Sequence, residues 1–138
     1  MKWAFEEAKP GDMVRVCLGE LYHYGIYVSD DEIIQFGPPP TTIMRKDEDI
    51  EVCVTGIDNF LLGKFLEVAV YDRKEKKKAK PNEEVIQIAR ERIGEKGYSI
   101  LYNNCEHFVH ECVFGEKFCS QTEGIRKLWR IKLQSLEK

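Results

Sequence analysis

Cys105 is the residue whose surroundings point most directly to chemistry, and it lies in the stretch Asn103-Asn104-Cys105-Glu106-His107-Phe108. Asparagine is favoured immediately before a helix, so Asn103 or Asn104 is expected to cap a helix that begins beside Cys105. The positive end of the helix dipole and the unpaired N–H groups there stabilise a thiolate and lower the pKa of the thiol. The same N–H groups could hold an oxyanion. This placement makes Cys105 the candidate nucleophile.

A nucleophilic thiol also needs a group that takes and returns a proton, and the sequence has three histidines. His107 and His110 share the predicted helix with Cys105, and 3.6 residues per turn places them about 200° and roughly 140° around it. His23 lies on another segment and can approach from outside the helix. Spacing therefore favours a dyad of Cys105 and His23, although a structural role for a cysteine at a helix start stays open.

Gln35 is a polar residue in an otherwise apolar strand, beside the strand that carries His23. A short turn joins the two strands, so both side chains can lie on one face of a sheet. The amide oxygen of Gln35 could then accept a hydrogen bond from the distal ring N–H and fix the tautomer. An amide would not stabilise an imidazolium as a carboxylate does. Exposure to solvent is the alternative for a glutamine in a strand.

The elements that must position these residues form a β-rich half followed by an α-rich half. Residues 9–12, Lys-Pro-Gly-Asp, are expected to turn the chain into the first strand. The strands expected from alternation and β-favouring residues span 13–18, 22–28, 32–37 and 66–71, with a weaker signal at 50–54. Residues 58–63 are expected to form a turn or a single helical turn. This order predicts an antiparallel β-meander.

Three helices are expected in the second half of the chain. The first follows Pro81, has Asn82 as its N-cap, and ends at Gly94 or Gly97. The second begins after Asn103 or Asn104, and the residues expected on its inner face are Phe108, Val109, Cys112 and Val113. The third has a capping box of Ser120 and Glu123. The basic stretch of residues 73–80 is expected to be a loop. The sequence thus predicts an α+β fold, an antiparallel sheet packed against about three helices, in a single domain of residues 1–138.

Composition narrows the class of protein further. The chain has 138 residues, 43% of them hydrophobic and 33% charged, with a net charge of −3. This is ordinary for a soluble globular protein, and the net charge alone decides nothing about an anionic partner. No apolar run reaches the roughly 18 residues of a membrane span, and the acidic N-terminus is unlike a signal peptide. A cytoplasmic protein without a transmembrane segment or a nucleic-acid partner is expected.

The five cysteines include no Cys-x-x-Cys pair, so neither a disulfide framework nor a zinc ribbon is expected. Cys105, His107, His110 and Cys112 could suggest a metal site, but they spread around the predicted helix and do not converge. Glu106 and His107 fit capping roles better than catalytic ones. No metal and no cofactor are predicted.

Three segments resemble the lecithin:retinol acyltransferase (LRAT)-like family, which includes the small vertebrate phospholipase/acyltransferases. They are Lys9-Pro10-Gly11-Asp12, Tyr22-His23-Tyr24-Gly25-Ile26-Tyr27-Val28 and Asn104-Cys105-Glu106-His107-Phe108-Val109. A pair of prolines, Pro38-Pro39, also falls where family members carry one, and the resemblance runs from about residue 8 to residue 128. The family is a permuted branch of the papain-like and NlpC-type cysteine enzymes. The resemblance therefore implies a permuted papain-like (NlpC-type) architecture.

The resemblance also implies a reaction and its residues. Cys105 is expected to attack an acyl ester, a phospholipid in this family, and to form a thioester that water, an amine or an alcohol resolves. His23 is the expected general base and then acid. Gln35 stands at the orienting position, where vertebrate members usually carry histidine. The expected residues of the substrate pocket are Tyr22, Tyr24 and Asn104.

Two departures keep other interpretations open. Animal relatives often end in a transmembrane helix, whereas residues 126–138 here are charged, so contact with an acyl-lipid substrate is expected to be peripheral. The basic residues 73–80 or the third helix with Trp129 could touch a membrane, or could simply be a solvated loop and a packed helix. A cysteine peptidase or amidase of the NlpC-type branch is one alternative function. A non-catalytic binding domain is the other, because Gln35 replaces a histidine.

Overall fold

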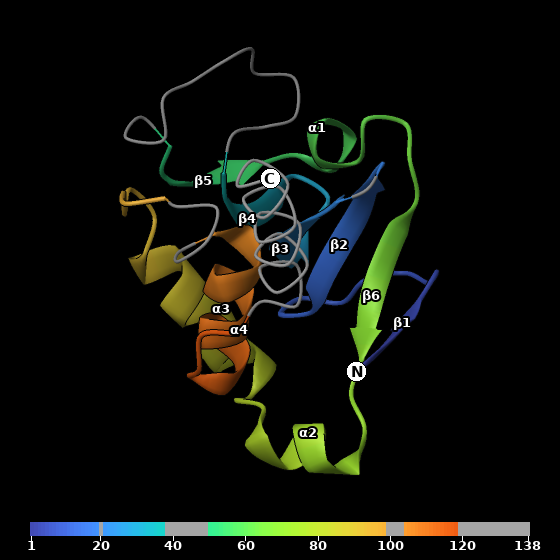
Figure 1. Cartoon of the computed structure of the whole chain (residues 1–138), viewed down its shortest axis with the longest axis vertical. Helices are drawn as coiled ribbons and strands as arrows, with labels where there is room; N and C mark the ends of the chain where they lie inside the picture. The colour runs from blue at the N-terminus through green and yellow to red at the C-terminus, as the bar shows by residue number, and fades with distance from the viewer. Residues whose placement is uncertain (20, 38–49, 99–103, 119–138) are drawn as a thin grey trace, which may run out of the picture.

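The computed structural model describes residues 1–19, 21–37, 50–98 and 104–118. The strands in these residues are β1 (Lys2–Ala4), β2 (Met13–Leu18), β3 (Leu21–Ser29), β4 (Glu32–Phe36), β5 (Val52–Thr55) and β6 (Leu66–Val70). The helices there are α1 (Ile57–Leu61), α2 (Arg73–Lys78), α3 (Asn82–Glu91) and α4 (Cys105–Phe114). The α+β class predicted from the sequence is confirmed (Figure 1). The permuted papain-like detail stays a prediction.

The strands described form one antiparallel sheet in the order β1-β6-β2-β3-β4-β5. Each strand from β2 to β5 pairs with the next one along the chain, so the predicted meander is confirmed. β6 then returns to pair with the outer edge of β2. β1 pairs with β6, with Trp3 opposite Ala69, and was not predicted because three residues are too few to show an alternating pattern.

The two faces of the sheet are covered by different helices. Tyr24 and Phe36 belong to one buried cluster, which includes Val85 of α3 and Phe108 of α4. Residues on the opposite face form a second cluster around Phe60 of α1. Figure 1 shows α3 and α4 together on one side of β3 and β4, and α1 above the far end of the sheet. The polar residues of the candidate site therefore lie in a sheet that is covered on both faces.

The turn of residues 9–12 fastens this sheet to α3. The backbone N–H of Gly11 donates to Tyr27 O at 2.7 Å, and the side-chain amide of Asn82 donates to Pro10 O at 2.9 Å. Gly11 has φ +92°, and a Cβ there would lie 2.5 Å from Cβ of Asn82. Glycine is required for both reasons, since L-residues avoid this conformation and no space is left for a side chain.

The predicted second helix is confirmed as α4, with Asn104 as its N-cap, and its predicted inner face is buried. The predicted first helix is confirmed as α3, but its N-cap is Pro81, one residue before Asn82, and it ends at Glu91 rather than at Gly94 or Gly97. The prediction of Asn82 as the cap was wrong because its side chain bonds to Pro10 instead. The proline pair at 38–39, the third helix from Ser120 and its Trp129 lie outside the described residues.

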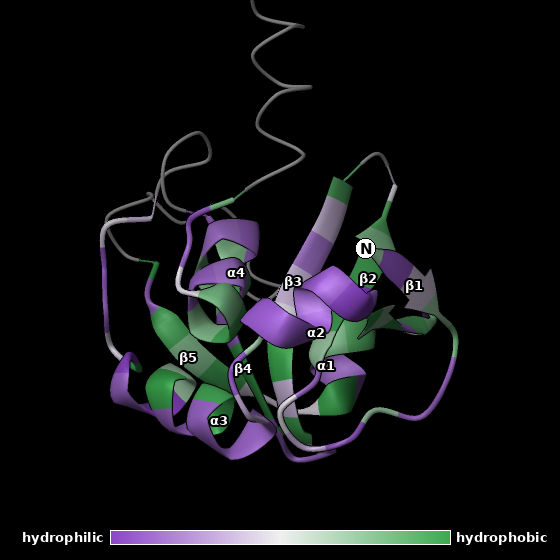
Figure 2. Ribbon diagram, turned by 90° about the horizontal axis from the view of Figure 1, so that it is seen from below, coloured by the Kyte–Doolittle hydropathy of each residue, from purple (hydrophilic) through white to green (hydrophobic). Residues whose placement is uncertain are grey.

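The prediction of a loop over residues 73–80 was wrong, because Arg73–Lys78 forms the helix α2. Its N-terminus has a capping box in which Glu75 N–H donates to Asp72 and the Asp72 N–H donates to Glu75. Lysines occupy its last turn, where the helix dipole favours cations. Local bonds and charges stabilise α2, and none of its residues is buried, so Figure 2 shows it as a hydrophilic helix.

None of the helices in the described part of the chain has the length and apolar run that a membrane crossing needs.

Candidate active site

The structure brings two of the predicted site residues together on neighbouring strands. His23 on β3 and Gln35 on β4 are both buried, and His23 Nε2 lies 2.7 Å from Gln35 Oε1. An amide oxygen can only accept, so Nε2 of the imidazole is the donor and carries the proton. The other ring nitrogen, Nδ1, then holds the lone pair that could accept a proton from a thiol. The predicted pairing of these side chains on one sheet face is confirmed.

Cys53 on β5 contacts the amide nitrogen of Gln35. Gln35 and Cys53 are directly opposite each other in the pairing of β4 with β5. The amide nitrogen of Gln35 donates to the Cys53 sulfur at 3.7 Å. In this orientation the amide oxygen faces His23. A flipped amide would instead donate to Nε2, which requires the other tautomer of the imidazole.

The imidazole of His23 is enclosed by apolar groups as well as by Gln35. The ring of Phe60 in α1 packs on it, with 5.1 Å between ring centroids. At the end of β4 the chain passes beside the ring, and a Cβ on Gly37 would lie 3.6 Å from Cε1 of His23. Burial lowers the pKa of His23, and the hydrogen bond to Gln35 opposes this only in part. The imidazole of His23 is therefore neutral at physiological pH.

Cys105 occupies the predicted place at the start of a helix. It is the first residue of α4, directly after the N-cap Asn104, and only 7% of its surface is exposed. α4 packs against β3, the strand that carries His23. The dipole of α4 places the equivalent of about half a positive charge at this end of the helix, which stabilises a thiolate.

The N-terminus of α4 is closed by its own side chains. Asn104 Oδ1 accepts hydrogen bonds from the backbone N–H groups of Glu106 at 3.0 Å and His107 at 3.1 Å. His107 Nδ1 in turn accepts from the backbone N–H of Asn104 at 3.0 Å, so the predicted capping role of His107 is confirmed. Because Asn104 already occupies two of the N–H groups expected to hold an oxyanion, an oxyanion would need other donors or would have to displace this side chain.

The other cysteines have roles that differ from that of Cys105. Burial raises the pKa of Cys112 to about 12, so its thiol stays protonated. Cys53 contacts Gln35, and the thiol of Cys17 donates to the backbone oxygen of Gly19 at 3.3 Å. Cys119 lies outside the described residues.

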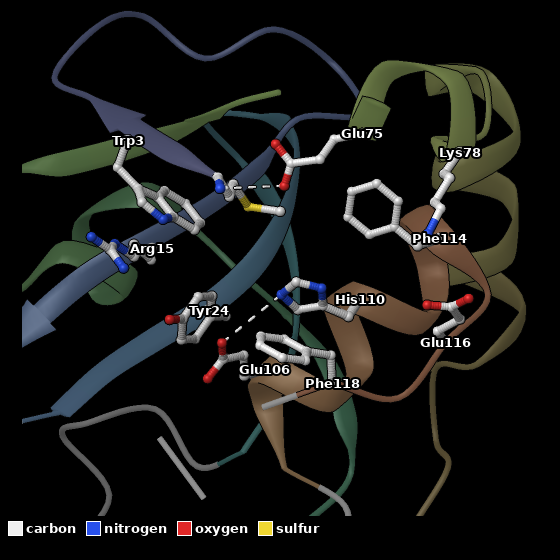
Figure 3. A pocket seen from close by; sticks show the side chains of 11 residues that line it. Trp3, Arg15, Tyr24, Glu75, Lys78, Glu106, His110, Phe114, Glu116 and Phe118 are labelled. Carbon is white, nitrogen blue, oxygen red and sulfur yellow. Dashed lines mark ion pairs between the residues drawn. The ribbon is translucent and has the colours of Figure 1, made fainter. Parts of the chain in front are cut away.

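The three residues predicted to line a substrate pocket lie in different surroundings. Tyr24 lines a cavity of about 420 Å³ between β3, α2 and α4, together with Glu106, His110 and Phe114 (Figure 3). The ring of Tyr22 instead packs on the Arg15 guanidinium, at 3.8 Å. Asn104 acts as the helix cap described above.

A buried acid and base face this cavity from α4. His110 Nε2 lies 3.9 Å from Glu106 Oε2, and both side chains are almost fully buried (Figure 3). Burial lowers the pKa of His110, and the negative charge of Glu106 opposes that effect. His110 lies five positions beyond Cys105 and pairs with Glu106 on its own helix, a contact that was not predicted.

Comparison with known proteins identifies the family. The lecithin retinol acyltransferase family matches residues 6–118, so the chain belongs to this family. Lecithin retinol acyltransferase of Bos taurus is 32% identical over 151 residues, covering 91% of this chain and 66% of the relative. Human phospholipase A and acyltransferase 4 is 28% identical over 138 residues, covering 86% of this chain and 77% of the relative.

The chain spans about two thirds or less of the length of the lecithin retinol acyltransferases of Bos taurus and Rattus norvegicus, at 66% and 62%. The resemblance inferred from the sequence motifs is confirmed by these matches.

Two residues of the site were not predicted, Cys53 and Phe60. Cys53 reaches Gln35 only through the register of β4 with β5, and residues 38–49 between these strands give no turn pattern that fixes such a register. Phe60 lies on the short helix α1, whose packing on His23 has no local signal in the sequence.

Proposed function

We propose that this protein is a thiol-dependent acyltransferase or acyl hydrolase, in which Cys105 attacks an acyl ester and His23 is the general base and acid. The observation that carries the proposal is the buried bond of 2.7 Å between His23 Nε2 and Gln35 Oε1. With the proton on Nε2, this bond supports the proposal that Nδ1 acts as the base. Membership of a family whose members are named acyltransferases, and relatives named phospholipase A and acyltransferase, support an acyl ester of a phospholipid as the substrate.

The first half of the reaction forms a thioester. His23 Nδ1 accepts the proton of the Cys105 thiol, and the sulfur attacks the carbonyl carbon of the ester. The C–O bond of the ester then breaks, and the departing alcohol oxygen takes the proton from Nδ1. The products of this half are the acyl group on Cys105 and, for a phospholipid, a lysophospholipid.

The second half transfers the acyl group. Water, an alcohol or an amine gives a proton to Nδ1 and attacks the thioester carbon, and the thiolate of Cys105 leaves and recovers the proton. Water as the acceptor yields a fatty acid, whereas an alcohol or an amine yields a new ester or amide. Through both halves, Gln35 is proposed to keep the imidazole in one tautomer and one orientation.

Intact-mass measurement after incubation with phosphatidylcholine tests this proposal. We expect a mass increase of one acyl group on the parent protein and on Cys112→Ala, and none on Cys105→Ala. Cys112 is the matched control because it lies on the same helix but burial raises its pKa to about 12. His23→Ala should slow acylation strongly without removing the thiol. Acylation of Cys105 by amides but by no ester would indicate a peptidase or amidase instead.

The result that excludes catalysis is also measurable. If the alkylation of Cys105 by iodoacetamide has the same pH dependence in the parent and in His23→Ala, the two residues do not form a dyad. Together with the absence of an acyl adduct, this outcome would favour a non-catalytic binding domain.

A further inference from the structure

Two phenylalanines on the surface of the sheet contact each other although both are largely exposed. Phe5, just after β1, is 75% exposed, and Phe65, just before β6, is 79% exposed. Their ring centroids lie 6.4 Å apart in an edge-to-face arrangement. They border a cavity of about 630 Å³ whose other apolar walls are Ala8, Ile57 and Leu66. Such a pair on the surface of a protein marks an interaction site more often than isolated apolar residues do.

The charges that surround this aromatic pair are negative. Glu6, Glu7 and Asp30 line the same cavity, and no lysine or arginine lines it in the described part of the chain. Lys64, beside Phe65, is exposed, but its single positive charge does not balance the three carboxylates, so the net charge around the cavity is negative. The hydroxyl of Tyr27 donates to Asp30, and that bond, burial and the charges of neighbouring carboxylates raise the pKa of Tyr27 to about 12. The cavity thus combines aromatic rings with a negative potential.

The cavity lies on the face of the sheet that carries the candidate base. Leu66 pairs with Val16, and Val16 pairs with His23, so these residues form one row across three strands. At about 4.8 Å between strands, the start of β6 is roughly 10 Å from the His23 backbone. α1 is shared as well, because Ile57 lines the cavity and Phe60 packs on His23.

We propose that this surface, Phe5 and Phe65 with Glu6, Glu7 and Asp30, docks the protein onto a zwitterionic phosphatidylcholine bilayer. The inference rests on the proposed function, since a phospholipid substrate must be taken from a membrane. The outermost charge of such a bilayer is the quaternary ammonium of choline, which aromatic faces and carboxylates attract. The phenyl rings enter the interface, where aromatic side chains are favoured. The same carboxylates repel anionic lipids.

This surface differs from the basic stretch that the sequence suggested for membrane contact. That stretch forms α2, which lies at the opposite end of the molecule from α1 in Figure 1. The two surfaces predict opposite responses to lipid charge, because lysines bind anionic lipids more tightly and carboxylates bind them less tightly.

Flotation of the whole protein with vesicles separates these possibilities. We expect binding to phosphatidylcholine vesicles that weakens when phosphatidylglycerol replaces part of the lipid. The double variant Phe5→Ala/Phe65→Ala should partition at least about tenfold less, equivalent to about 1.4 kcal/mol. Ile93→Ala removes an exposed apolar side chain (44% exposed) from the turn after α3 and should bind as the parent does. Lys76→Glu/Lys77→Glu should also leave binding unchanged.

The proposal is overturned if phosphatidylglycerol strengthens binding and Lys76→Glu/Lys77→Glu abolishes it, or if the phenylalanine variant binds as tightly as the parent. Absence of binding to phosphatidylcholine overturns it as well. Cys105→Ala should float with the vesicles like the parent, so failure of the acyl chemistry and failure of the docking surface are read separately. Thermal unfolding of each variant confirms that the fold is retained.

Discussion

Replacement of Gln35 by leucine is the most direct test of the proposed orientation of His23. The glutamine is fully buried, and its side chain bonds to His23 on one side and to Cys53 on the other. Leucine fills a similar volume without a hydrogen-bonding group. In Gln35→Leu the Nε2–H of His23 loses its acceptor, so the ring can take the other tautomer, in which Nδ1 carries the proton and cannot act as a base.

The size of the effect follows from the loss of one buried acceptor. A buried donor left without a partner costs about 1–3 kcal/mol. Since about 1.4 kcal/mol corresponds to a factor of ten, kcat/KM for acyl transfer should fall roughly 5- to 150-fold. The pKa of His23 should also fall further, because burial already lowers it and Gln35 is the group that raises it. The acidic limb of the pH–rate profile should therefore move to lower pH while its plateau drops.

Two measurements check this prediction together. Nitrogen-15 NMR of the imidazole reports which ring nitrogen of His23 is protonated, and the rate of thioester formation across pH gives the limb and the plateau. Gln87→Leu is the matched control, because it makes the same substitution at an exposed position on α3. In the described part of the chain, the side chain of Gln87 donates to Glu91 and does not contact His23. If the tautomer of His23 and the acidic limb are the same in Gln35→Leu and the parent, Gln35 does not orient the base.

Three further outcomes are expected. Gly11→Ala should destabilise the protein by several kcal/mol, since φ is +92° and the added Cβ would lie 2.8 Å from Cα of Asn82; an unchanged unfolding midpoint in urea would contradict this contact. Cys53→Val should slow acylation less than the loss of Gln35 does, and NMR should detect a minor tautomer of His23; Cys53→Ser, which keeps an acceptor, should restore the parent spectrum. Stability should fall as pH drops below about 6.5, because burial lowers the pKa of both His110 and His23 and the unfolded chain then binds more protons. The pH dependence of the unfolding free energy should flatten in part in His110→Gln, and a curve identical to that of the parent would exclude a contribution from His110.

Features that depend on local sequence could be predicted. The alternation in β2, β3 and β4 and the short polar turns between them determine the meander, because each strand needs only its neighbour in the chain. The start of α4 could be predicted since Asn104 caps it with its own side chain. The pairing of His23 with Gln35 also depends on a register shift between Tyr27 and Ser29, which brings both side chains to one face of the sheet and has no signal in the turn itself.

Features that depend on contacts between distant segments could not be predicted. Asn82 was expected to cap α3, but its side chain bonds to Pro10, which is 72 positions away in the chain. α2 is different, because its signals are local: a capping box of Asp72 and Glu75 and lysines in the last turn. It was missed because it buries no side chain and so shows no apolar stripe. Cys53 approaches Gln35 only after β5 is added to the edge of the sheet.

A glutamine at position 35, where the resemblance to the family leads one to expect a histidine, has a defined consequence for the proposed proton transfer. A neutral amide fixes the tautomer of His23 but adds no negative charge, so burial dominates and the pKa of the imidazole is lowered. A base of lowered pKa draws a thiol proton less strongly, and more of the driving force must come from the thiol. The position of Cys105 at the start of α4 provides this, because the helix dipole stabilises the thiolate without any charged side chain. We therefore expect Gln35→Glu to raise the pKa of His23 and to move the acidic limb of acylation to higher pH, opposite to Gln35→Leu. A shift of both variants in the same direction would show that the group at position 35 does not act on the imidazole through its charge.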